Sequence, residues 1–198
     1  MKPKTSWYIY RHKRRSIFAI ILLILISMFL FQNATFEIRT LTAIAFLLAF
    51  YSVDHFFDLK FKHFHYGIIL LIAIFTLLLS PLYFVYPQYD KMQHFVIPIL
   101  LSFLVFHMMT KQKLELKWKI AFTAITVLSI LTIHEIMEYS LDLLFDLKLQ
   151  GVFLRDLAGL QKLNIIQNQI DDTMIDLIWG LAGAMTYGIM HLKFFNKN

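Results

Sequence analysis

The chain has 198 residues, of which 59% are hydrophobic and 16% charged, an apolar share above that of ordinary water-soluble domains. It contains no cysteine, which excludes disulfide bonds, thiolate metal sites and cysteine nucleophiles. The net charge of +6 does not indicate nucleic-acid binding, because the basic residues lie in short connections between apolar runs.

The apolar runs predict an all-α fold, a polytopic membrane bundle of about six transmembrane helices forming a single domain over residues 1–198. The expected spans cover residues 16–31, 40–53, 65–86, 89–109, 118–145 and 172–194. The first run follows a basic segment, but it has no small-residue cleavage pattern, so we interpret it as a retained helix. The connection over residues 146–171 mixes apolar and polar residues, as is typical of a segment at the membrane interface.

The distribution of basic residues predicts the orientation of the chain. With the N-terminus in the cytoplasm, five of the 19 Lys and Arg residues fall outside and the remaining 14 fall inside. The outside residues are Arg39, Lys91, Lys148, Arg155 and Lys162. This asymmetry predicts a multi-pass protein of the cell membrane with both termini cytoplasmic.

Three stretches place ionisable side chains inside apolar runs: Asp90–His94, His134–Glu138 and Asp172–Asp176. In each stretch the first and last residues are four apart, so a helix presents both on one face. Under the predicted orientation all three stretches lie toward the outer end of their spans. We therefore expect the polar faces to meet at similar depth.

Five carboxylates and two imidazoles in a medium of low dielectric constant require a cation, protons or basic partners to neutralise them. A divalent metal ion (Mn, Zn, Mg or Fe) fits ligands of this type. The predicted metal ligands are Asp90, His94, Glu135, Glu138, Asp172 and Asp176. We expect His134 to have a catalytic role as a proton relay, or to support a ligand.

Simpler explanations exist for several of these residues. Asp90 and Asp172 stand where a helix begins and would serve as N-caps, and His94 would serve as a hydrogen-bonded core residue. Acidic residues inside a span, such as Glu138, are functional candidates by default. Elsewhere, Asp54 is expected to face water or lysines at the cytoplasmic end of its span.

The stretch Asp90–Phe95 resembles the Asp-Lys-x-x-His-Phe signature of VanZ-like membrane proteins. The YjdF-like family is the closer match, because its members also carry a Glu-x-x-Glu and an Asp-Thr-x-x-Asp element, here Glu135–Glu138 and Asp172–Asp176. Relatives often have an acidic residue where this chain has Gln169. The resemblance implies a multi-pass helical membrane protein and, for the VanZ-like branch, a link to glycopeptide-antibiotic resistance.

The leading hypothesis is an outward-facing, metal-dependent hydrolase that cleaves a phosphate or ester bond of an envelope lipid or lipid-linked substrate. We expect membrane lipids as its partners, and we expect no binding to nucleic acid. One alternative is a cation or proton-coupled transporter, although transport sites usually lie near the membrane midplane, often at inverted repeats. The other is a structural or accessory protein whose polar cluster joins helices without catalysis.

Overall fold

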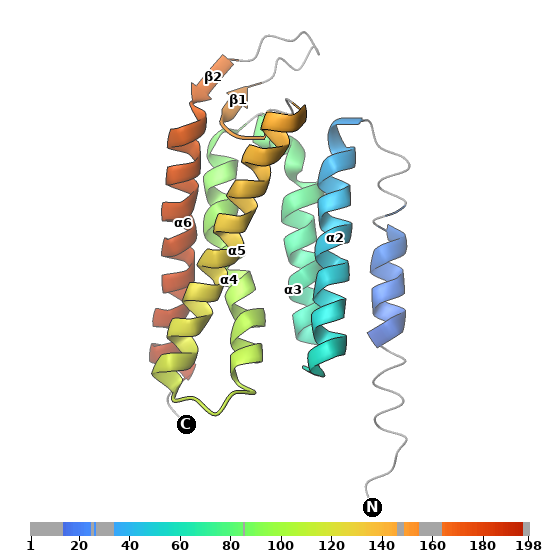
Figure 1. Cartoon of the computed structure of the whole chain (residues 1–198), viewed down its shortest axis with the longest axis vertical. Coiled ribbons are helices and arrows are strands. Elements are labelled where there is room, and N and C mark those ends of the chain that lie inside the picture. The colour runs from blue at the N-terminus through green and yellow to red at the C-terminus, as the bar shows by residue number, and fades with distance from the viewer. Residues whose placement is uncertain are drawn as a thin grey trace, which may run out of the picture. The chain divides into compact units, whose positions relative to one another are not determined.

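The computed structural model describes residues 14–24, 26, 34–84, 86–145, 149–154 and 164–195. The chain divides into two compact units, Met1–Leu78 and Leu79–Asn198. Most described residues are helical (Figure 1). The predicted helical class is therefore confirmed, whereas the single domain stays a prediction.

The first unit is built from apolar helices. Residues 14–24 are helical and are followed by α2 (Ala34–Phe57) and α3 (His63–Ala73). A π-helical turn, η1 (Ile74–Leu78), continues directly from α3. The core includes Leu47 and Phe61, and the ring of Phe61 stacks on that of Phe50 at 4.6 Å between centroids.

Asp54 does not face water, so that prediction is wrong. Its side chain is 0% exposed, and Oδ2 accepts a hydrogen bond of 2.8 Å from Nη1 of Arg14, which is itself 4% exposed. The hydroxyl of Tyr66 donates to the same oxygen at 3.2 Å. The helix at residues 14–24 brings the guanidinium to α2, and a buried ion pair takes the place of solvent.

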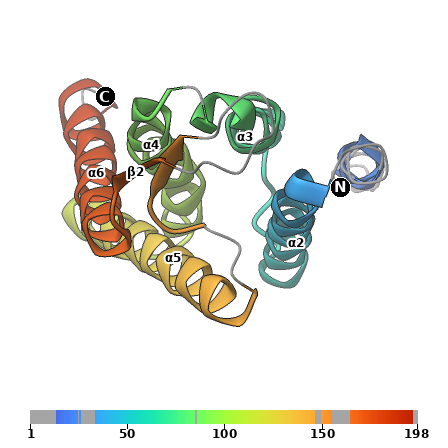
Figure 2. The same cartoon turned by 90° about the horizontal axis from the view of Figure 1, so that it is seen from above.

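The second unit contains three long helices and a small sheet. Its elements are η2 (Ser80–Phe84), α4 (Gln88–Met109), α5 (Leu116–Phe145), β1 (Val152–Leu154), β2 (Asn164–Gln167), α6 (Gln169–Met190) and η3 (His191–Phe195). In Figure 1, α4 and α6 begin, and α5 ends, beside the two strands. The view from above shows the strands over the ends of these helices (Figure 2).

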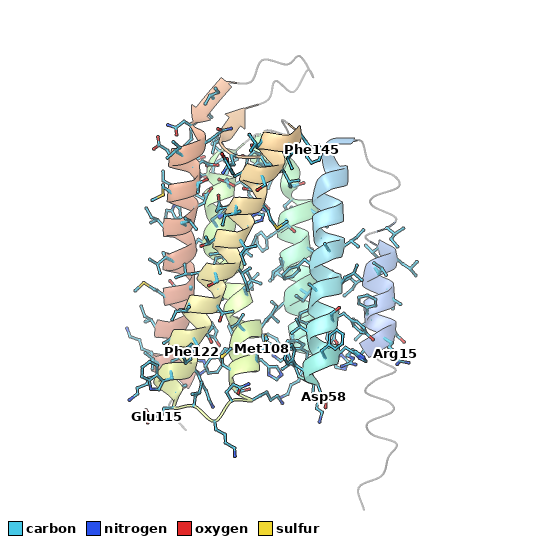
Figure 3. The ribbon with its side chains drawn as sticks, in the orientation of Figure 1. Arg15, Asp58, Met108, Glu115, Phe122 and Phe145 are labelled. Carbon is cyan, nitrogen blue, oxygen red and sulfur yellow. The ribbon has the colours of Figure 1, made fainter. Side chains whose placement is uncertain are left out.

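The opposite end of this unit is marked by Met108 near the end of α4 and Glu115 just before α5 (Figure 3). Phe145, the last residue of α5, lies at the end that carries the strands (Figure 3). The starts of α4 and α6 and the end of α5 therefore share one end of the unit. The polar stretches of the sequence lie on these three segments.

Small residues allow α6 to pack closely on its neighbours. A methyl group added to Gly183 would overlap the backbone oxygen of Phe95 on α4, and one added to Gly180 would overlap the side chain of Leu131 on α5. Pro98 lies inside α4 and is also close to Gly183. The backbones of α4 and α6 approach each other here because neither of these positions on α6 carries a side chain.

Among the described residues, three helices are long and apolar enough to cross a membrane: Gln88–Met109, Leu116–Phe145 and Gln169–Lys193. Two shorter apolar helices cover Ala43–Phe57 and His63–Leu78. The last three predicted spans therefore correspond to long apolar helices. The full set of six spans stays a prediction.

The antiparallel pair β1 and β2 was not predicted within the connection at residues 146–171. Phe153 faces Ile165 in the ladder, and the register shifts between Val152 and Phe153. Both strands are short and contain apolar or β-branched residues, which favour extended structure. Strands of three and four residues give too weak a periodic signal to be recognised in sequence.

Candidate functional site

Helix geometry brings the polar stretches together. Asp90 lies in the first turn of α4, and Asp172 lies in the first turn of α6. Neither residue caps its helix, because the N-cap positions are Pro87 and Asn168, and the side chain of Asn168 accepts the N–H of Asp171. Helix capping therefore does not explain Asp90 or Asp172.

The ammonium group of Lys91 lies at the centre of three aspartates. Its Nζ is 2.8 Å from Oδ2 of Asp90, 2.6 Å from Oδ1 of Asp172 and 2.8 Å from Oδ1 of Asp176. A lysine has three N–H donors, and these three contacts use all of them. Lys91 thus joins α4 to the first two turns of α6.

His94 faces the two aspartate oxygens that Lys91 leaves free. Nε2 of His94 is 3.7 Å from Oδ1 of Asp90 and 3.8 Å from Oδ2 of Asp176. Ligand atoms of these three residues all lie within 4.8 Å of one another, close enough to hold a metal ion. We call this group, formed by Asp90, His94 and Asp176, the cation site.

Asp172 differs from the other two aspartates because both of its oxygens are engaged. Oδ1 accepts from Lys91 at 2.6 Å, and Oδ2 accepts the backbone N–H of Gly151 at 2.8 Å. Asp172 therefore ties Lys91 to the segment that follows α5. Because its two oxygens contact Lys91 and Gly151, Asp172 is a weaker candidate for a ligand than the sequence indicated.

The carboxylates of α5 lie on the other side of the His94 ring. Nδ1 of His94 is 3.9 Å from Oε1 of Glu135. Glu138 instead pairs with His134, with 3.4 Å between Oε1 and Nε2. The ring centroids of His134 and His94 lie 6.3 Å apart. The six predicted ligands therefore gather at one end of the unit, but they do not surround a single point.

A short segment after α5 covers this cluster, and we call its residues, Leu149–Gly151, the outer strap. Asp142 near the end of α5 holds the outer strap, since Oδ1 accepts the N–H of Leu149 at 2.7 Å and Oδ2 accepts the N–H of Gln150 at 2.8 Å. The hydroxyl of Tyr83 donates to the carbonyl oxygen of Gly151 at 2.8 Å. Gly151 has φ of 88°, a conformation that glycine adopts without the strain a side chain would cause.

Most carboxylates of the cluster are buried, so their negative charges are poorly solvated. Asp90, Glu135, Asp172 and Asp176 are each 7% exposed or less. Glu138 is more exposed but interacts electrostatically with these carboxylates. Among the described residues in contact with them, Lys91 is the one permanent cation.

Sequence reasoning missed the roles of Lys91 and the outer strap. Lys91 was counted only as a charge outside the membrane, although it follows Asp90 directly and lies in the same motif as His94. That position within the motif was the available signal. Gly151 gave no comparable signal, because a glycine in a long connection is common.

Comparison with known proteins identifies a family but no activity. A family model described as "Predicted membrane protein (DUF2238)" matches residues 13–197. No curated protein and no solved structure matches the chain. The match agrees with the apolar helices in indicating a membrane protein, and the VanZ-like or YjdF-like relationship stays a prediction.

Proposed function

The chain belongs to this membrane-protein family, DUF2238, and we propose that it is a cation-dependent hydrolase embedded in the membrane. Its substrate would carry a phosphate or ester bond in an envelope lipid or lipid-linked molecule. The observation that carries the proposal is the cation site, in which Asp90, His94 and Asp176 offer converging ligand atoms.

The spacing of the cation site supports direct coordination. Bonds of roughly 2.0 to 2.2 Å from a metal to nitrogen or oxygen place neighbouring ligand atoms about 3 to 3.6 Å apart. Nε2 of His94 lies 3.7 Å from Asp90 and 3.8 Å from Asp176. These two distances exceed the upper end of that range by only a few tenths of an ångström, roughly, and the ligand atoms of all three residues lie within 4.8 Å of one another.

The charges of the cluster support the same proposal. Five ionised carboxylates and the single ammonium of Lys91 leave four negative charges without a counter-charge. Unpaired charges in a medium of low dielectric constant are strongly unfavourable. A divalent cation bound beside Lys91 removes half of this imbalance, and protons or further cations would balance the rest.

The remaining polar residues take supporting roles in this proposal. Lys91 and Asp172 fix the helix starts, so that one oxygen each of Asp90 and Asp176 faces His94. His134 has a side chain 44% exposed and pairs with Glu138 at 3.4 Å. That accessibility suits a group that exchanges protons with water or substrate.

Two carboxylates and one imidazole leave several coordination positions for water and substrate, as a catalytic site requires. When bound, the cation would polarise a phosphoryl or carbonyl oxygen and lower the pKa of a bound water toward about 7. The proposed outer location of the cluster, from the predicted topology, makes lipids or lipid-linked molecules of that leaflet the natural substrates.

The test begins with metal binding. Full-length protein purified in detergent without chelators would be dialysed against Mn²⁺, Zn²⁺, Mg²⁺ or Fe²⁺ and its metal content measured by mass spectrometry. Asp176→Asn should lower cation affinity at least tenfold, since even loss of groups that only support ligands costs about 10 to 100-fold. Asp171→Asn is the matched control, because Asp171 is exposed on the same helix and exchanges hydrogen bonds with Asn168 rather than with the cluster.

The second stage measures hydrolysis. p-Nitrophenyl phosphate, p-nitrophenyl esters and phospholipids in mixed micelles would report cation-dependent cleavage by the wild type and its absence in His94→Gln. Cation binding without cleavage of any of these substrates would favour the transporter. A folded wild-type protein that binds none of the four cations would exclude the proposal.

One observation favours a second function, that of an accessory protein without catalysis. Lys91 already supplies a cation to three aspartates, and such contacts join α4 to α6 whether or not a metal is present. This function predicts that Asp176→Asn changes stability while the wild type binds no metal. The measurements above therefore separate the two functions.

A further inference from the structure

We infer that the ammonium group of Lys91 occupies the position of a second cation beside the cation site, so that the chain binds one divalent ion where two-metal enzymes bind two. This inference rests on the proposed function and deepens it, because it sets the number of ions that the site takes. Lys91 is then a positioning residue, which acts through carboxylates that it shares with the divalent ion.

Two aspartates connect Lys91 to the cation site, because each divides its oxygens between Lys91 and His94. In Asp90, Oδ2 lies 2.8 Å from Nζ of Lys91, and Oδ1 lies 3.7 Å from Nε2 of His94. In Asp176, Oδ1 lies 2.8 Å from Nζ, and Oδ2 lies 3.8 Å from Nε2. Both carboxylates therefore bridge the ammonium and the cation site, as carboxylates do between the two ions of a di-metal centre.

Each of the two positions also has a ligand of its own. Asp172 belongs to the ammonium position, since Oδ1 lies 2.6 Å from Nζ of Lys91 while Oδ2 accepts from Gly151. His94 belongs to the cation site. Three carboxylate oxygens at 2.6 to 2.8 Å thus surround Nζ, and Ca²⁺ takes oxygen ligands at about 2.3 to 2.6 Å. The ammonium therefore occupies a position whose ligands suit a hard divalent ion.

Burial makes a cation in this position necessary. The three aspartates around Nζ are buried, and buried carboxylates are strongly unfavourable without a counter-charge. Lys91 supplies that charge from within the chain, so it cannot dissociate as a free ion can. Removal of the ammonium leaves the same three carboxylates without it, and a divalent ion from solution should then take its place.

The arrangement also defines what Lys91 contributes to the proposed reaction. All three of its N–H donors are used by aspartates, so it contributes positive charge rather than a hydrogen bond to substrate. A fixed positive charge beside the cation site favours the negative charge that develops on a phosphoryl oxygen. The chain would thus combine one exchangeable ion with one permanent cation.

Lys91→Ala tests the inference, because it removes the ammonium and opens the position that it fills. Lys91→Met removes the charge but keeps an unbranched side chain of similar length in that position. Lys117→Ala is the matched control, since Lys117 pairs with Glu115 at the start of α5 and both side chains are 71% exposed. All variants would be made in the full-length chain and purified in detergent.

The first measurement counts Mn²⁺ ions per chain and records their electron paramagnetic resonance spectrum. The wild type, Lys91→Met and Lys117→Ala should each bind one ion with the spectrum of an isolated Mn²⁺. Lys91→Ala should bind two, with the spectrum of an exchange-coupled pair, since ions in two-metal sites lie only about 3.5 to 4 Å apart. Loss of a merely structural contact would not raise the number of bound ions.

Two results of this measurement would overturn the inference. One is a Lys91→Ala protein that binds no more Mn²⁺ than the wild type. The other is a second ion in Lys91→Met as well, because that ion could not occupy the filled position of the ammonium.

The second measurement separates the two positions by their own ligands. Asp172→Asn added to Lys91→Ala should lower the affinity of the second Mn²⁺ at least tenfold and spare the first, since even groups that only support ligands are worth about 10 to 100-fold. His94→Gln added to Lys91→Ala should have the opposite effect. Loss of the same ion in both double variants would contradict two adjacent positions.

A stability measurement covers the case in which Lys91→Ala folds poorly. Mn²⁺ should raise the SDS concentration at which Lys91→Ala unfolds by more than it does for the wild type, because the ion replaces the ammonium between α4 and α6. A Lys91→Ala protein that does not fold even in excess Mn²⁺ would overturn the inference.

The same counts distinguish this inference from the proposed function. A wild type that binds no Mn²⁺, together with a Lys91→Ala protein that binds one ion, would keep Lys91 in a cation position while the neighbouring cation site fails. One ion in both proteins would leave the cation site standing and remove the inference. No ion in either protein would overturn both.

Discussion

Gly183→Ala probes the contact that holds α4 against α6. The added methyl group would overlap the backbone oxygen of Phe95 and press on Pro98. The backbone of α4 cannot change rotamer as a side chain can, so the two helices must move apart. Overpacking of this kind costs about 1 to 3 kcal/mol, and alanine offsets roughly 1 kcal/mol of it through its better helix propensity. We expect a net loss of up to about 2 kcal/mol in the free energy of unfolding.

Two other glycines give a graded comparison. A methyl group on Gly180 meets the side chain of Leu131, which can move, so Gly180→Ala should cost less than Gly183→Ala. A methyl group on Gly67 in α3 meets nothing within 4 Å, so Gly67→Ala should raise stability by about 1 kcal/mol or less. Unfolding of the full-length protein in mixed micelles of increasing SDS content would rank the three variants.

The same substitution should affect the polar cluster. Nζ of Lys91 on α4 lies 2.8 Å from Oδ1 of Asp176 on α6. Separation of the helices would lengthen this distance. Gly183→Ala should therefore lower both the cation affinity and the free energy of unfolding. Gly67→Ala should lower neither quantity. A Gly183→Ala protein as stable as Gly67→Ala would refute the close packing of α4 on α6.

Two further predictions concern other parts of the chain. Asp54→Asn should destabilise the protein by about 3 to 5 kcal/mol, because the buried guanidinium of Arg14 loses the negative charge of Asp54. Asp58→Asn, at an exposed position, should change little, and equal SDS unfolding curves for the two variants would contradict the buried pair. Because the chain has no cysteine, Gln88→Cys should be labelled by an impermeant thiol reagent added outside cells and Gln112→Cys should not. The opposite labelling pattern would reverse the predicted topology.

The sequence alone determined the class of the protein and the location of its polar residues along the chain. Apolar runs with basic connections indicate a helical membrane protein because backbone hydrogen bonds must be satisfied within the lipid. Spacings of four residues place Asp90 with His94, and Asp172 with Asp176, on common helix faces. Alternation of the spans then puts these faces at one end of the bundle, as α4, α5 and α6 have them.

The tertiary structure decided which atoms of those residues meet. Periodicity gives the face of a helix but not its rotation toward a neighbour, and it does not show where a long, flexible side chain ends. For this reason Lys91 was expected outside the membrane, whereas its ammonium lies among three aspartates. The same limit hid the pairing of Asp54 with Arg14, since the two residues lie on different helices.

Contacts made by irregular backbone could also not be predicted from the sequence. Gly151 and Gln150 bond to Asp172 and Thr173, and Asp142 accepts the N–H groups of Leu149 and Gln150. No repeating pattern encodes such contacts, because each is an individual hydrogen bond between segments apart in sequence. Helix spacing therefore determined where the polar groups gather, and tertiary hydrogen bonds decided which of their oxygens and nitrogens face one another.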